Sequence, residues 1–289
     1  MANPPFYSNT AELLTSASLK SRPPFTACTG SASEMVTPGG ETAFVTRLIS
    51  ESLVLRSRIR WYTAMLGKLS SVSSLVATLR EHRVDNYAVT EFIQGTKTRR
   101  WGLAWSFGDR RPAMAAARAA RGAGIPKGLL PFPSEYVITV SLSLYGLLGL
   151  IARRRAHLCQ LPINTTGLLV RTTNAIDATL TSLQLQWQWE PAIGTGVGFT
   201  SKNVWSRSAR RKSAHTCSDQ GGSDDTEDEM LFGFKIRVWE DQSKEEKQIQ
   251  MVQDAGQELA IHVLVRWLKG HDSILFESFC GMLKRKLGA

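Results

Sequence analysis

The sequence is poor in cysteine. Its 289 residues include four, Cys28, Cys159, Cys217 and Cys280, which are far apart, form no Cys-x-x-Cys pair and lie near no cluster of histidines. This spacing favours neither a zinc site nor a disulfide framework, so we expect no bound metal. The first six residues also lack the basic and apolar segments of a secretory signal. An intracellular, reducing compartment is therefore expected.

A long hydrophobic run is missing as well. The most apolar stretch, 137–151, is about 15 residues long and is followed by three arginines, whereas a membrane-spanning helix needs about 20 residues. We therefore expect no membrane partner.

Acidic residues are fewer than basic ones. The chain has 35 Lys and Arg against 25 Asp and Glu, and residues 47–127 alone hold 15 basic and 5 acidic residues, a surplus of ten. Arginine predominates there, and its planar guanidinium pairs with phosphates and stacks on bases. This surplus favours a polyanionic partner such as RNA, although a solvated basic surface has the same composition.

The first half of the chain has the pattern of an α/β domain. We expect a helix at 44–55 followed by a buried strand at 61–66. A second helix carries Leu75, Val76 and Leu79 on one side, and its N-cap is Ser70, Ser71 or Ser73. Two further strands are expected at 87–93 and 101–107. The last two strands form a hairpin around the basic loop 95–100. This order is typical of the second half of a doubly wound sheet.

The second half predicts a smaller α+β unit. Residues 111–132 are expected to be a linker, and 133–289 to be an accessory domain with alternating strands at 183–189, 232–238 and 259–268 and a closing helix after Asp272. Residues 194–198 are interpreted as a flexible loop, and 206–229 as a disordered acidic insert. Residues 142–170 are either an unusual loop, present as a genuine insert, or a translated intron, and the intron is our hypothesis.

The motif that carries chemistry is Asn3-Pro4-Pro5-Phe6. An adenine N6 amine is a poor nucleophile until its hydrogens are held in a productive direction, and the amide oxygen of Asn3 and the carbonyl of Pro4 can each accept one N–H. The prolines remove competing donors, and Phe6 can stack on a base that has left its helix. A proline-rich turn with a buried Phe is the alternative.

Four further blocks, taken with this motif, resemble the methyltransferase-like protein 16 family, which modifies U6 small nuclear RNA, and bacterial ribosomal-RNA adenine methyltransferases. The blocks are Gly39-Gly40-Glu41 with Phe44-Val45, Trp61 through Lys68, Thr90-Glu91-Phe92 with Gln94-Gly95, and Arg100-Trp101 with Ala104 through Phe107. The resemblance implies a partial Rossmann-like class I methyltransferase domain at 1–110. It also implies S-adenosyl-L-methionine as cofactor, a U6-like RNA hairpin as substrate and a nuclear location.

The resemblance also implies roles for particular residues. Asn3, Pro4, Pro5 and Phe6 would form the adenine pocket, and Lys97, Arg99 and Arg100 would contact the RNA backbone, although these three residues could instead form a solvated hairpin tip. Arg22 is a further RNA-binding candidate. In the second unit the candidates to test for RNA contact are Trp205, Arg207, Arg210 and Arg211.

The sequence departs from the family before the tetrapeptide. There the family binds its cofactor on a Gly-rich turn and an acidic strand end, whereas here Met1 and Ala2 precede the motif. Cofactor-binding residues are therefore expected upstream of Met1, and the 289 residues alone are expected to have little activity. A non-catalytic RNA-binding protein is the alternative to an RNA adenine-N6 methyltransferase.

Overall fold

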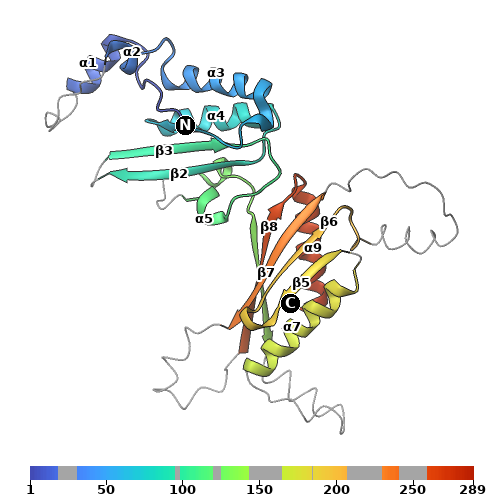
Figure 1. Ribbon diagram of the computed structural model, residues 1–289. Coiled ribbons are helices and arrows are strands. Elements are labelled where there is room, and N and C mark those ends of the chain that lie inside the picture. The colour runs from blue at the N-terminus through green and yellow to red at the C-terminus, as the bar shows by residue number, and fades with distance from the viewer. Residues whose placement is uncertain are drawn as a thin grey trace, which may run out of the picture. The chain divides into compact units, whose positions relative to one another are not determined.

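The computed structural model consists of two compact units, Met1–Pro133 and Ser134–Ala289 (Figure 1). The structure describes residues 1–18, 31–94, 98–119, 125–142, 165–183, 185–206, 230–240 and 259–289. Each unit has its own hydrophobic core. None of the described helices is both long and apolar enough to cross a membrane.

The first unit is built on a three-stranded sheet. Its strands are β1 (Tyr62–Leu66), β2 (Tyr87–Gln94) and β3 (Thr98–Trp105), in the order β1-β3-β2. Because β3 is antiparallel to both neighbours, β1 and β2 run parallel to each other, and their carboxyl ends lie at the same edge of the sheet. Ala2 forms a parallel bridge on the other side of β1. The expected strands and hairpin are confirmed.

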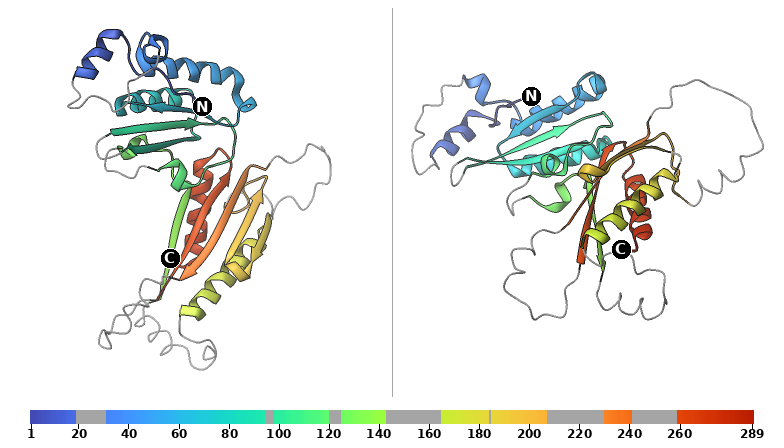
Figure 2. Two further views of the ribbon diagram at one scale, coloured as in Figure 1. Left: turned by 60° about the vertical axis from the view of Figure 1, so that its left-hand side comes forward. Right: turned by 60° about the horizontal axis from the view of Figure 1, so that its bottom comes forward.

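Two helices cover one face of this sheet, as Figures 1 and 2 show. They are α3 (Gly40–Leu55) and α4 (Leu69–Glu81), and α4 connects β1 with β2. Val45, Ile49, Leu75 and Leu79 are fully buried against the strands, as their helical spacing predicts. The short helices α1 (Thr10–Ser18), α2 (Ala32–Met35) and η1 (Arg56–Arg58) complete this part of the unit.

The expected linker packs on the first unit wherever the structure describes it. It contains α5 (Met114–Ala117), which packs against β2, and η2 (Lys127–Leu129). Ala117 and Ile125 are buried, and Arg111 forms an ion pair of 2.8 Å with Asp85. Single apolar residues fill gaps in the core here without a repeating period, so the sequence pattern did not indicate packed structure.

The second unit is a five-stranded antiparallel sheet with two helices on one face (Figure 2). The strands are β4 (Glu135–Leu142), β5 (Gln186–Glu190), β6 (Thr195–Thr200), β7 (Phe232–Glu240) and β8 (Leu259–Lys269), in the order β4-β8-β7-β6-β5. The helices are α7 (Thr165–Thr181) and α9 (Ser273–Leu287), and η3 (Pro191–Ile193) connects β5 with β6. The α+β character expected from the sequence is confirmed.

Two expectations for the second unit were wrong. Residues 194–198 are not a flexible loop, because Gly194 ends η3 and residues 195–198 lie in the internal strand β6. Trp205 is not available as an RNA contact, since it is 3% exposed and packs against Phe232 and Phe279. Residues 165–170, the end of the segment interpreted as a loop or a translated intron, form the first turns of α7, and Leu168 lies in the core. The intron hypothesis itself stays a prediction.

The closing helix α9 follows its sequence signals. The Asp272 side chain accepts hydrogen bonds from the backbone N–H groups of Ile274 (2.8 Å) and Leu275 (3.2 Å), as an N-cap does. Lys284, Arg285 and Lys286 lie in the last turn, where positive charge complements the helix dipole.

Candidate adenine site

The tetrapeptide Asn3–Phe6 is held by backbone pairing at both ends. Before it, the Ala2 N–H donates to the carbonyl of Thr63 (2.7 Å), and the N–H of Met65 donates to the carbonyl of Ala2 (3.1 Å). After it, the Tyr7 N–H donates to the carbonyl of Met35 (3.2 Å), and the Tyr7 carbonyl accepts from Thr37 (3.0 Å). The loop therefore leaves one strand edge and ends at another short bridge.

Two acceptors of the loop are not used within the described protein. Pro4 is buried, whereas Asn3 is exposed. Among the described residues, neither the side-chain amide of Asn3 nor the carbonyl of Pro4 takes part in a hydrogen bond. These oxygens can accept the two N–H groups of an adenine amine, as the motif predicts.

Phe6 lies between two other parts of the expected site. A Cβ atom on Gly67, just after β1, would be 3.1 Å from Cδ1 of Phe6, so glycine permits this close approach. The guanidinium of Arg100, on β3, lies 5.1 Å from the centroid of the Phe6 ring. This distance is within the range of a cation–π contact. The structure thus brings together a predicted adenine-stacking residue and a predicted RNA-binding residue.

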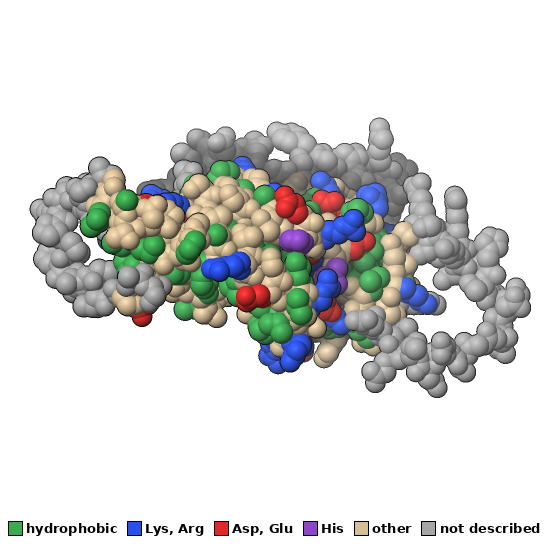
Figure 3. Space-filling model, turned by 90° about the horizontal axis from the view of Figure 1, so that it is seen from above, with side chains coloured by type: hydrophobic (Ala, Val, Ile, Leu, Met, Phe, Trp, Pro, Cys, Tyr) green, Lys and Arg blue, Asp and Glu red, His purple; other side chains and the backbone are tan. Residues whose placement is uncertain are grey.

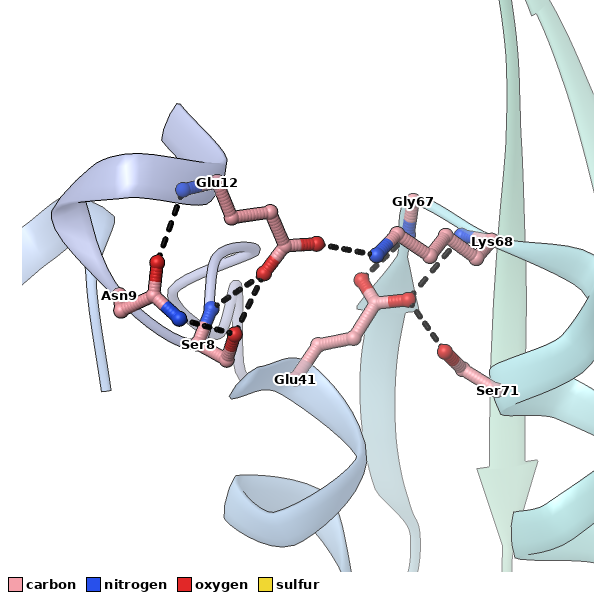
Figure 4. Close-up of polar contacts among 7 residues, drawn as sticks. All are labelled: Ser8, Asn9, Glu12, Glu41, Gly67, Lys68 and Ser71. Atoms are coloured by element: carbon pink, nitrogen blue, oxygen red, sulfur yellow. Dashed lines mark hydrogen bonds and ion pairs between the residues drawn. The ribbon is translucent and has the colours of Figure 1, made fainter. Parts of the chain in front are cut away.

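Glu41 holds the junction between β1 and α4 beside this loop (Figure 4). Its side chain is buried and accepts hydrogen bonds from the backbone N–H groups of Gly67 (2.6 Å) and Lys68 (3.0 Å) and from the hydroxyl of Ser71 (2.6 Å). The expected serine N-cap of α4 is therefore wrong, because Lys68 occupies that position and a distant carboxylate binds the free donors. The Gly39-Gly40-Glu41 block was the available sequence signal.

A second carboxylate, Glu12, binds α1 to the same junction (Figure 4). It accepts hydrogen bonds from the ammonium of Lys68 (2.6 Å) and from the backbone N–H (2.8 Å) and hydroxyl (2.6 Å) of Ser8. The bond from Lys68, followed by those from Ser8, lowers the pKa of the Glu12 carboxyl to about 2. The same ion pair raises the pKa of Lys68. Sequence reasoning did not find this pair.

We expect Glu12→Gln to lower the melting temperature at pH 6 but not at pH 2. A carboxyl whose pKa falls from 4.5 to about 2 on folding stabilises the fold above pH 4.5, and this contribution is lost as the pH falls towards 2. Thermal unfolding of both proteins between pH 2 and 6 measures the difference. Glu51→Gln is the matched control, because Glu51 is exposed and has no ion pair within the described ranges. A pH-independent difference for Glu12→Gln would contradict the assignment.

Of the other arginines and lysines predicted to contact RNA, one lies in the described structure and the rest do not. Arg99 is 48% exposed, but its guanidinium donates to the fully buried carboxylate of Glu91 across the hairpin. It is therefore partly engaged in a structural ion pair. The remaining candidates lie outside the described residues: Arg22, Lys97, Arg207, Arg210 and Arg211.

Basic side chains do not gather in a single patch on the face seen in Figure 3. Lys and Arg side chains are scattered there among hydrophobic, acidic and neutral ones. On this face the basic surplus of the sequence does not form one continuous positive surface, whereas the contact of Arg100 with Phe6 gives a specific position for one cation.

The described residues beside the tetrapeptide do not form a site for S-adenosylmethionine. The nearest junction between a strand and a helix contains one glycine, Gly67, and its N–H is bound by Glu41 together with that of Lys68. These are the donors that would otherwise face a carboxylate ligand.

The first unit resembles proteins of known activity. Residues 1–109 match a family described as RNA methyltransferase. The chain is 29% identical over 288 residues to the U6 small nuclear RNA (adenine-(43)-N(6))-methyltransferase of Schizosaccharomyces pombe. It is 45% identical over 111 residues to the RNA N(6)-adenosine-methyltransferase METTL16 of Homo sapiens. The resemblance seen in the sequence is confirmed.

The lengths covered by these matches differ. The match with the S. pombe protein includes 99% of this chain and 59% of that protein, and the match with the human protein includes 38% and 20%. The chain therefore spans less than two thirds of either relative. Among solved structures, the hMettl16 catalytic domain in complex with MAT2A 3'UTR hairpin 1 is 40% identical over 42% of this chain and 41% of that chain, with a TM-score of 0.36.

Proposed function

We propose that this protein takes part in S-adenosylmethionine-dependent methylation of an adenine N6 amine in structured RNA, with a U6-like hairpin as substrate. The observation that carries the proposal is the Asn3–Phe6 loop, which presents two unused acceptors beside an aromatic ring and an arginine. The names of the relatives support the same reaction. We also propose a nuclear location, as the resemblance implies.

The residues of the loop have separate roles in this reaction. The amide oxygen of Asn3 and the carbonyl of Pro4 each accept one N–H of the amine, so that the nitrogen lone pair is directed away from the ring plane. Phe6 stacks on the flipped base, and Arg100 pairs with a phosphate or stacks beside it. S-adenosylmethionine, held by residues other than the described ones beside the tetrapeptide, would supply the electrophilic methyl group.

A non-catalytic RNA-binding protein is the second candidate function. This candidate is favoured because the described residues beside the tetrapeptide offer no site for a methyl donor. Both candidates predict RNA binding that weakens with salt. The two candidate functions therefore have to be distinguished by testing whether the RNA becomes methylated.

The decisive experiment is detection of N6-methyladenosine. The chain is joined to the segment that precedes the corresponding tetrapeptide in the S. pombe relative and is incubated with S-adenosylmethionine and a U6-like hairpin. We expect N6-methyladenosine in the digested RNA, and none when the target adenine is replaced by guanine. RNA binding without any methylated nucleoside would instead support the second candidate. A matched reaction with the 289 residues alone measures the contribution of the added segment.

A further inference from the structure

One face of the second unit's sheet is not covered by a described helix. Both α7 and α9 pack on the face that carries Phe234, Ile236, Val263 and Val265 (Figure 2). Side chains alternate along each strand, so the intervening residues point to the other face, which we call the open face. Its residues on β4, β8 and β7 are Glu135, Val137, Thr139, His262, Leu264, Arg266, Lys235, Arg237 and Trp239.

The open face is accessible to solvent. Val137 is 51% exposed although it lies in a strand, and Thr139 and Arg237 are also exposed. Lys235 and Trp239 are half-buried, as expected for side chains that stand side by side on a bare sheet. An uncovered sheet face of this kind can bind a partner.

Like charges lie directly opposite each other at the centre of this face. Lys235 on β7 and Arg266 on β8 are register partners, and Arg237 is two residues further along β7. Like charges at such positions destabilise a sheet unless a counter-charge is close. Arg266 has Glu135 at 3.9 Å, whereas Lys235 and Arg237 have no ion pair with any described residue. Among the described residues, no ion pair therefore balances the positive charge of Lys235 and Arg237 at the centre of the face.

The carboxylates of the face come from its two edge strands. Glu135 on β4 lies 3.9 Å from Arg266, and Glu190 lies at the end of β5 in the same row as Arg237, with Thr195 between them. The two strands with the cations, β7 and β8, are internal. A polyanion crossing the middle of the sheet would therefore meet Lys235 and Arg237 on β7, whereas Glu135 is already close to Arg266.

Aromatic rings lie on both sides of the cations, on β7 and on its neighbours β6 and β8. Trp239 and His262 are register partners, with ring centroids 5.5 Å apart and planes inclined by 35°. Phe199 on β6 lies opposite Gly233, two residues before Lys235, and is half-buried. Cations with aromatic rings on both sides suit a nucleic acid, because phosphates bind the cations and unpaired bases stack on the rings.

We propose that the open face binds a single-stranded segment of RNA through Lys235, Arg237 and Trp239. This inference rests on the proposed function only in taking RNA as the partner, and it requires no methyl transfer. The phosphates neutralise Lys235 and Arg237, and an unpaired base stacks beside Trp239. Recognition is independent of sequence, since these contacts read the backbone and the face of a base.

The test is the double variant Lys235→Gln/Arg237→Gln in the full 289-residue chain. With a fluorescent single-stranded RNA at about 0.1 M salt, we expect affinity to fall about 10-fold. The slope of log affinity against log salt should fall in magnitude by about 1.4, that is, about 0.7 for each lost phosphate contact on a single strand. The matched control is Lys284→Gln/Arg285→Gln, which removes the same charge from the exposed end of α9. Equal behaviour of the two double variants would overturn the proposal.

A second variant tests the stacking contact. We expect Trp239→Ala to weaken binding to single-stranded RNA about 5-fold or more, with little effect on duplex RNA, and Trp239→Phe to restore most of the affinity. Polyglutamate of equal charge is the control ligand. If it binds the unchanged protein as tightly as RNA does, the face accepts acidic chains in general and the assignment to RNA is wrong.

These results are independent of the proposed enzymatic reaction. Loss of RNA affinity in the Lys235/Arg237 variant, with methylation at saturating RNA unchanged, would support both inferences. Loss of affinity in a protein that never forms N6-methyladenosine would support the open face and exclude the enzymatic proposal. Thermal unfolding of each variant confirms that the second unit remains folded.

Discussion

Asn3→Ala is expected to lower methyl transfer about 100- to 1,000-fold while RNA affinity changes less than about twofold. A rate loss of this size is typical when one polar group that acts mainly in the transition state is removed. Asn3 is exposed and has no hydrogen bond within the described protein, so its replacement breaks no hydrogen bond there. Single-turnover methylation at saturating RNA, in the joined protein described above, measures the rate separately from binding.

Asn9→Ala is the matched control for Asn3→Ala. Asn9 is also exposed, but its side-chain oxygen accepts the backbone N–H of Glu12 (2.8 Å) and caps α1. Its loss is expected to cost about 1 kcal/mol of local helix stability and to leave methylation within about threefold of the unchanged protein. Unchanged methylation by Asn3→Ala would remove the amide from the mechanism and favour a structural turn.

Gly198→Ala is expected to destabilise the second unit by about 3 kcal/mol, at the upper end of the cost of overpacking a core. A Cβ atom at this position would lie 2.3 Å from Cζ of Phe234. The ring cannot move away, because Phe234 is fully buried and its centroid is 4.2 Å from that of Phe279. Hydrogen exchange of the β7 and β8 amides measures the free energy of unfolding of this unit.

Gly281→Ala provides a control of opposite sign. Gly281 lies inside α9, and a Cβ atom there would be 3.5 Å from the Arg285 side chain, an ordinary contact. Alanine is favoured over glycine in a helix interior, so we expect a gain of about 0.5–1 kcal/mol. A change within about 0.5 kcal/mol for Gly198→Ala would show that the core around Phe234 can relax.

Periodic segments were the most predictable part of the fold. The helix around Val45 and Ile49 and the alternating strand from Phe232 show their buried faces directly in the residue pattern. β6 has no such pattern, because Gly196 and Gly198 take positions that neighbouring aromatic rings fill. A strand that contributes space for the rings of other strands looks like a loop in the sequence.

The candidate site was predictable only in its individual parts. The chemistry of Asn3 and Phe6 follows from the tetrapeptide, and the role of Arg100 was implied by the family resemblance. Their proximity depends on Ala2 pairing with β1 while β3 returns along the other side of β1. Arg99 was predicted for RNA, but its partner Glu91 lies on the neighbouring strand, and the sequence did not indicate that pair.

The sequence by itself determined the class of the protein, because short motifs and hydrophobic periods are local properties of the chain. It also determined the residue types at the adenine site. Only the tertiary structure decided which polar groups already have hydrogen-bond partners and which remain free to bind a ligand. The carboxylate of Glu41 already accepts hydrogen bonds from the amides of Gly67 and Lys68, whereas the Asn3 side chain has no partner among the described residues. It also placed Lys235 opposite Arg266 on an uncovered face. Strand pairing joins residues that are distant in sequence, and no local pattern specifies that register.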